Sequence, residues 1–124
     1  MLDSSAIIAV FHREPGADFI VSHLAEGLVS AVNVQEVVKK MLDRGYTLDV
    51  IAESIRSLGI QVVAHDAEDA YLAASLAPVT KEFGRGIGDR SCMALAIRLG
   101  VPAITTDRSW AKLEIPGLDV ILAR

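Results

Sequence analysis

Short apolar runs alternate along this chain with longer segments whose apolar residues recur at helical spacing. Parallel strands need a crossover between them, usually a helix, so this alternation is typical of an α/β domain with a largely parallel sheet. The apolar runs predict strands at 1–3, 28–32, 60–64, 101–106 and 118–122. The amphipathic segments predict helices at 4–13, 17–25, 33–43, 47–58, 67–77, 89–99 and 108–113.

Residues that favour helix ends set the expected boundaries. Asn33 is expected to cap the helix that follows the second strand. That cap would place Glu36 at the third helical position, where a Glu completes a capping box. Gly88 or Asp89 is expected to cap a later helix. Pro78 is expected to end the helix before it, because the residue preceding a proline avoids helical conformation.

The composition describes an ordinary globular chain, which we expect to form a single domain over residues 1–124. It is 52% hydrophobic and 23% charged, so it is not expected to be disordered. A charged residue interrupts every apolar run well before the ~18 residues of a membrane span, and no signal-peptide pattern opens the chain. We therefore expect a cytoplasmic protein with no membrane partner. A single cysteine, Cys92, fits a reducing compartment and is expected to be a buried helix residue.

The charge distribution is less even than the net charge of −4 suggests. That total argues against a protein that binds nucleic acid over its whole surface. Between Lys81 and Lys112, however, six basic residues stand against three acids, and two of those acids lie where a strand meets a helix. A basic rim around an acidic centre suits a metal-dependent phosphodiester enzyme. Solvated helix faces are the ordinary alternative.

Four carboxylates occupy equivalent places in the predicted topology, either at the seam between a strand and a helix or in the first turn of a helix: Asp3, Glu36, Asp89 and Asp107. In an open parallel sheet such seams converge on the carboxyl edge of the strands, where ligands bind. Four acids meeting there would repel one another unless a divalent cation neutralised them. The sequence therefore predicts an acidic metal site. The competing interpretation is helix capping by the three aspartates and a capping box completed by the glutamate.

The segments that carry these acids resemble the PIN domain and, more narrowly, the VapC-type toxins of prokaryotic toxin–antitoxin pairs. They are 2–6 (LDSSA), 30–38 (SAVNVQEVV), 88–96 (GDRSCMALA) and 105–110 (TTDRSW). The likeness covers essentially the whole chain in order and length. It implies a three-layer α/β/α fold with a mostly parallel central sheet, and the activity of a metal-dependent endoribonuclease.

The resemblance also implies roles for individual residues. The quartet Asp3, Glu36, Asp89 and Asp107 would bind one or two Mg²⁺ or Mn²⁺ ions, and Ser5 and Thr105 match hydroxyl positions that support the site. Two such ions about 4 Å apart can activate a water for cleavage of an RNA phosphodiester bond without a histidine base. Only two residues precede Asp3, whereas the family has several apolar residues there. Either the start of the sequence is trimmed or mis-assigned, or this carboxylate is expected to be held less rigidly than usual.

Partners follow from the same resemblance. The expected substrate is RNA, with phosphate contacts from Arg85, Arg90 and Arg108. A cognate antitoxin is expected to cover the groove, and the apolar face of the helices at 4–13 and 47–58 is expected to dock the antitoxin or a second copy in a homodimer. Four points stay open: which RNA is cleaved, Mg²⁺ or Mn²⁺, one ion or two, and the identity of the antitoxin.

Two other classes of phosphate enzyme gather acids at a sheet edge, and both fail on spacing. A receiver-type phosphoacceptor needs an acid pair after its first strand, but Ser4 follows Asp3. A haloacid-dehalogenase-type phosphatase needs a second acid two residues after its nucleophile, and Ser5 stands there. The remaining rival is a PIN-fold binding or scaffold protein with little or no turnover.

Overall fold

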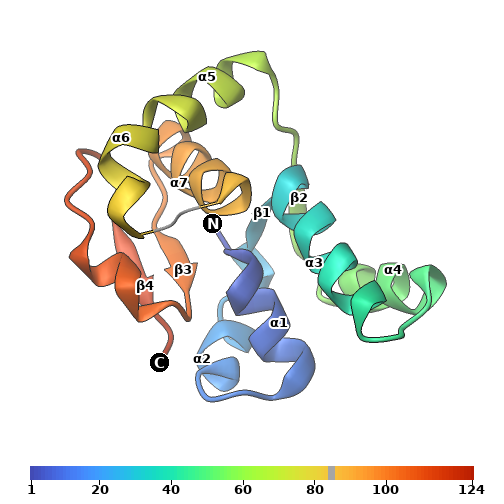
Figure 1. Ribbon diagram of the computed structural model, residues 1–124. Helices are drawn as coiled ribbons and strands as arrows, with labels where there is room; N and C mark the ends of the chain where they lie inside the picture. The colour runs from blue at the N-terminus through green and yellow to red at the C-terminus, as the bar shows by residue number, and fades with distance from the viewer. Residues whose placement is uncertain (84–85) are drawn as a thin grey trace.

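The central sheet is built from short parallel strands that meet along the first three residues of the chain (Figure 1). The computed structural model describes residues 1–83 and 86–124. Leu2 forms parallel bridges to Val29 on one side and to Ile104 on the other. The strands pair in parallel on either side of it, β1 (Leu28–Ser30) with β2 (Gln61–Val63) and β3 (Ala103–Thr105) with β4 (Val120–Leu122). The prediction of a mostly parallel sheet is confirmed.

The helices follow the strands along the chain as the apolar pattern predicted. They are α1 (Ser4–His12), α2 (Ala17–Val21), α3 (Ala31–Asp43), α4 (Leu48–Ser57), α5 (Ala67–Ser75), α6 (Ala77–Thr80) and α7 (Ile87–Leu99). Three short 3-10 helices complete the described elements: η1 (Leu24–Glu26), η2 (Lys81–Phe83) and η3 (Arg108–Lys112). None of the helices in the described ranges is long and apolar enough to cross a membrane.

Two apolar cores lie on opposite faces of the sheet, because successive residues of a strand point to opposite sides. Met1 packs into one core and Leu2 into the other, and Ala103 and Ile104 divide in the same way. The first core holds the buried run of α7 from Ser91 to Ala96, which α5 covers; the second holds the apolar faces of α1 and α3. This arrangement is the expected α/β/α layering. Cys92 is fully buried, as expected, and burial raises the pKa of its thiol well above the ordinary value.

Two predicted helix starts are wrong. Ser30 caps α3, since its hydroxyl accepts a hydrogen bond from the Val32 N–H at 3.1 Å. The strand before it is shorter than expected, so the helix starts earlier and Asn33 lies inside its first turn. Similarly, α7 begins at Ile87 with Gly86 as its cap. The helix before Pro78 ends as expected, since α5 stops at Ser75, and Pro78 itself lies in the first turn of the next helix, α6, where its missing N–H costs nothing.

The corrected start of α3 changes the interpretation of Glu36. Counting from Ala31, Glu36 is the sixth residue of the helix, beyond the first turn. A capping box requires the acid at the third position, which Asn33 occupies. Helix capping therefore does not explain this carboxylate.

Candidate functional site

The predicted site lies at the carboxyl ends of the central strands, where three helices begin. Asp3 directly follows the central strand segment and caps α1. Glu36 comes from α3, which follows β1, and Asp89 from the first turn of α7. Asp107 follows β3 and caps η3. The parallel topology thus places all four acids at one edge of the sheet.

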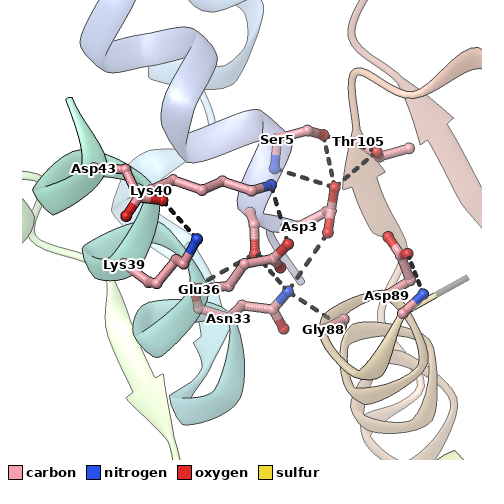
Figure 2. A network of polar contacts seen from close by, with 12 residues as sticks. Asp3, Ser5, Asn33, Glu36, Lys39, Lys40, Asp43, Gly88, Asp89 and Thr105 are labelled. Atoms are coloured by element: carbon pink, nitrogen blue, oxygen red, sulfur yellow. Dashed lines mark hydrogen bonds and ion pairs between the residues drawn. The ribbon is translucent and has the colours of Figure 1, made fainter.

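Asp3 is the most enclosed of these acids, with 3% of its surface exposed. Its Oδ2 accepts hydrogen bonds from the Ser5 hydroxyl at 2.6 Å, the Ser5 N–H at 3.2 Å and the Thr105 hydroxyl at 3.1 Å (Figure 2). Its Oδ1 accepts a bond from the Asn33 amide at 3.5 Å. The expectation of a loosely held Asp3 is therefore wrong. Met1 and Leu2, which precede it, are hydrogen-bonded between β1 and β3 in the middle of the sheet.

The enclosure of Asp3 has an electrostatic cost. Desolvation by burial raises the pKa of this carboxyl above its ordinary value, although the hydrogen bonds from Ser5 and Thr105 act in the opposite direction. Burial is the larger cause, so the ionised carboxylate is destabilised in the folded protein. A cation placed beside Asp3 would offset that cost.

Glu36 is held from two sides. Its Oε2 accepts a hydrogen bond from the Ser4 hydroxyl at 2.6 Å, and its Oε1 pairs with the Lys40 ammonium at 3.0 Å. The backbone of α7 comes so close that a Cβ added at Gly88 would overlap Oε2. A larger residue at this position would therefore force the Glu36 carboxylate or α7 to move.

Asn33 joins the two carboxylate environments and was missed as a site residue by sequence reasoning. It is fully buried. Its side-chain amide donates to the Ser4 hydroxyl at 2.9 Å, to the Gly88 carbonyl at 3.2 Å and to Asp3 at 3.5 Å (Figure 2). The signal that could have found it was its spacing of three residues before Glu36, which puts both side chains on one face of a helix.

The other two acids are anchored by backbone N–H groups. Asp89 accepts a hydrogen bond from the Gly86 N–H at 2.9 Å. Asp107 accepts bonds from the N–H and the hydroxyl of Ser109 at 2.9 and 2.6 Å. Thr105 connects this end of the site to the centre, because its hydroxyl accepts from the Asp107 N–H at 3.1 Å and donates to Asp3. The capping roles proposed for Asp3 and Asp107 are real, and they fix both carboxylates at the sheet edge.

The predicted basic residues lie on the elements that carry these acids. Arg90 is a partly buried residue of α7, next to Asp89, and Arg108 is an exposed residue of η3, next to Asp107. Arg85 lies outside the described residues. A groove of about 480 Å³ runs beside Glu36 and is lined by Val32, Gln35, Glu36, Lys39, Ile87 and Gly88.

The donors of the site fit a hard divalent cation. All four acids offer carboxylate oxygens, the ligands that Mg²⁺ and Mn²⁺ prefer. Within 1–83 and 86–124, no group of three or more His, Cys, Asp or Glu residues is assembled closely enough to hold an ion by itself. Mg²⁺ is usually bound through one or two carboxylates and keeps several waters, so such a group is not required. The cost of ionising the buried Asp3 also favours a cation at this place.

The family model described as the PIN domain matches residues 1–116, and the chain belongs to this family. Among curated protein sequences, none matches the chain.

Several solved structures share the fold. A chain of VapBC2 from Rickettsia felis, bound to a DNA fragment from its promoter, aligns with a TM-score of 0.74 and 13% identity over 98% of this chain and 96% of its own. A toxin–antitoxin complex from Klebsiella pneumoniae aligns with a TM-score of 0.73 and 17% identity over 99% of this chain and 96% of its own. VapBC-5 from Mycobacterium tuberculosis aligns with a TM-score of 0.53 and 24% identity over 75% of this chain and 79% of its own. At these identities the likeness establishes the fold.

The close approach of α7 to Glu36 predicts a position-specific effect of adding a methyl group. Gly88→Ala is expected to lower the free energy of unfolding by about 1–3 kcal/mol, because Glu36 or α7 must move. Gly86→Ser is the control, since the added Cβ would meet nothing nearer than an Asp89 oxygen at 3.9 Å and serine is a good helix cap. Urea unfolding of both variants measures the difference. Equal effects would contradict the packing described.

The raised pKa of Asp3 predicts a pH dependence in the absence of divalent metal. The folded protein binds this proton more tightly than the unfolded chain, so the free energy of unfolding falls as pH rises from the ordinary pKa of 3.8 through the raised value. Asp3→Asn cannot ionise, and asparagine is an equally good cap. Its stability relative to the wild type is therefore expected to increase across this window. Thermal unfolding in EDTA tests this, and a pH-independent difference would rule the explanation out.

Proposed function

We propose that this chain is a metal-dependent endoribonuclease, the toxin of a type II toxin–antitoxin pair, acting on RNA in the cytoplasm. Its membership of the PIN domain family supports the class of activity. The observation that carries the proposal is the hydrogen-bond network that joins Asp3, Glu36 and the start of α7 through Asn33 and Ser4. Buried amides and hydroxyls that fix carboxylates at an open edge suit the recognition of a cation.

The proposed ligands are Asp3, Glu36, Asp89 and Asp107, with Ser5 and Thr105 as supporting hydroxyls. A bound Mg²⁺ or Mn²⁺ ion would supply Lewis-acid activation of water and stabilisation of charge on the phosphate. The side chains around the proposed ligands hold the carboxylates in place. Ser5 and Thr105 hold one oxygen of Asp3 and leave the other toward Asn33, while Ser4 fixes one oxygen of Glu36. The four acids thereby present their carboxylates from three different helices and from the end of β3.

RNA phosphates would be bound by arginines beside the acids. Arg90 and Arg108 each follow a proposed ligand directly. Asp89 and Arg90 lie on the α-helix α7, where adjacent residues point about 100° apart, so Arg90 need not enter the ligand set. Arg108 is exposed beside Asp107. We propose that both guanidinium groups contact RNA phosphates. Arg85, three residues before Gly88, is proposed for the same role from its place in the sequence. No aromatic stacking platform is found among the residues that line the groove, so the proposal does not specify a base sequence.

The proposed antitoxin would cover an apolar face formed by α1, α3 and α4. A hollow of about 130 Å³ on this face is lined by Phe11, Met41, Tyr46, Val50, Ile51 and Ser54. Val50 and Leu48 are 53% and 58% exposed, which is high for aliphatic side chains. The hollow has the size of one or two apolar side chains of a partner segment. We also propose that the free toxin is a homodimer.

The first test separates a nuclease from a scaffold of the same fold. Asp89→Asn is expected to reduce Mn²⁺-dependent cleavage of a single-stranded RNA by about 100-fold or more, because it removes a ligand charge. The asparagine oxygen can still accept from the Gly86 N–H, so α7 keeps its start. Asp43→Asn, at an exposed acid paired with Lys39, is the control and should cleave normally. Unchanged cleavage by Asp89→Asn would favour the scaffold.

The second test concerns the apolar face. Val50→Asp is expected to leave RNA cleavage unchanged, because Val50 lies on α4, which carries none of the proposed ligands, and to prevent inhibition by the co-expressed cognate antitoxin. Light scattering with and without the antitoxin reports the assembly. An inhibited variant would place the antitoxin elsewhere, and a free wild-type chain that is monomeric at every concentration would contradict the homodimer.

A further inference from the structure

Both oxygens of the Glu36 carboxylate are already engaged within the protein. Ser4 donates to Oε2 at 2.6 Å, and the Lys40 ammonium pairs with Oε1 at 3.0 Å. Figure 2 shows the Lys40 side chain directed along α3 to the Glu36 carboxylate. A cation that used Glu36 as a ligand would meet this ammonium first.

The two partners of Glu36 differ in how easily they can leave. Ser4 is buried and also accepts from the Asn33 amide, so its hydroxyl is fixed. On the same side, Gly88 leaves no space for the carboxylate to turn toward α7. Lys40, by contrast, has a side chain that is 46% exposed and carries its charge on a flexible four-carbon stem. The ammonium is therefore the partner that can move away.

We propose that Lys40 is a built-in counter-ion that holds Oε1 of Glu36 in the metal-free protein and yields this position to a divalent cation. The inference rests on the proposed function, since it takes Glu36 as a ligand. Lys40 is a positioning residue: it neutralises and orients the carboxylate before the cation arrives. The presence of Lys40 lowers the affinity of the site for the cation, because the Lys40–Glu36 ion pair must be broken before the cation can bind Oε1.

A neighbouring pair on the same helix gives an internal control. Lys39 and Asp43 also form an i,i+4 ion pair, at 2.6 Å, with side chains 72% and 56% exposed. Such exposed helix pairs are common and weak. Lys39 and Lys40 carry the same charge on adjacent residues, but only Lys40 pairs with a proposed ligand. Removing either charge changes the net charge equally, so a difference between the two variants reports the pairing with Glu36.

The experiment is a calorimetric titration of Mn²⁺ into the metal-free protein without RNA. K40M is expected to bind Mn²⁺ about two- to fivefold more tightly than the wild type, the range given by an exposed ion pair. K39M and K40R are expected to match the wild type within about twofold. K40Q repeats the test with a polar side chain of similar length. Circular dichroism establishes that each variant keeps its helices.

A double-mutant cycle distinguishes action through Glu36 from a general change in charge. In an E36Q background, K40M is expected to give no tighter Mn²⁺ binding than K39M. Equal affinities of K40M and K39M in the wild-type background, or weaker binding by K40M, would overturn the inference and leave the proposed ribonuclease intact. A wild type that binds no Mn²⁺ would overturn the metal-dependent function, and the inference with it.

Discussion

The site depends on the burial of one carboxylate, that of Asp3, at the point where the central strand ends. The first residues of the chain lie between β1 and β3, so the sheet itself delivers this acid to its own edge. Burial raises the pKa of Asp3, and hydrogen bonds from Ser5 and Thr105 offset part of that cost, while the Asn33 amide donates to the other oxygen. Each donor comes from a different part of the chain, and together they determine where α1, α3 and β3 meet. The stability cost of the carboxylate and its fitness to hold a cation are therefore two consequences of the same burial.

The polar network extends from Asp3 to the other acids by short steps. Asn33 connects Asp3 to Ser4 and to the backbone of α7, and Thr105 connects it to the start of η3. Gly88 lets α7 approach close enough to complete these contacts. None of these linking groups is an acid, which is why an inspection of charged residues alone misses them. The acids supply the charge of the site, and the uncharged residues supply its geometry.

Much of the fold could be predicted from the sequence, because the alternation of apolar runs and helical periodicity is a local property. The strands around Val29, Val62, Ile104 and Ile121 and the long helices were predicted correctly in type. The ends of these elements were harder to predict. Ser30 and Asn33 are both good caps, and the choice between them depends on where β1 stops. The positions of the four acids at one sheet edge followed from topology. The packing of Gly88 against Glu36 depends on a distance between two elements that no local pattern contains. The pairing of Glu36 with Lys40 is local, because the two residues are four apart on α3, and sequence reasoning overlooked it.

The central claim is that the four acids form one cation site at the carboxyl edge of the sheet. A crystal of the protein soaked in Mn²⁺ and measured for anomalous scattering tests this most directly. We expect one or two anomalous peaks within about 2.5 Å of carboxylate oxygens drawn from Asp3, Glu36, Asp89 and Asp107. Occupied peaks only at surface acids such as Asp43 or Glu53, with none at this edge, would contradict the claim.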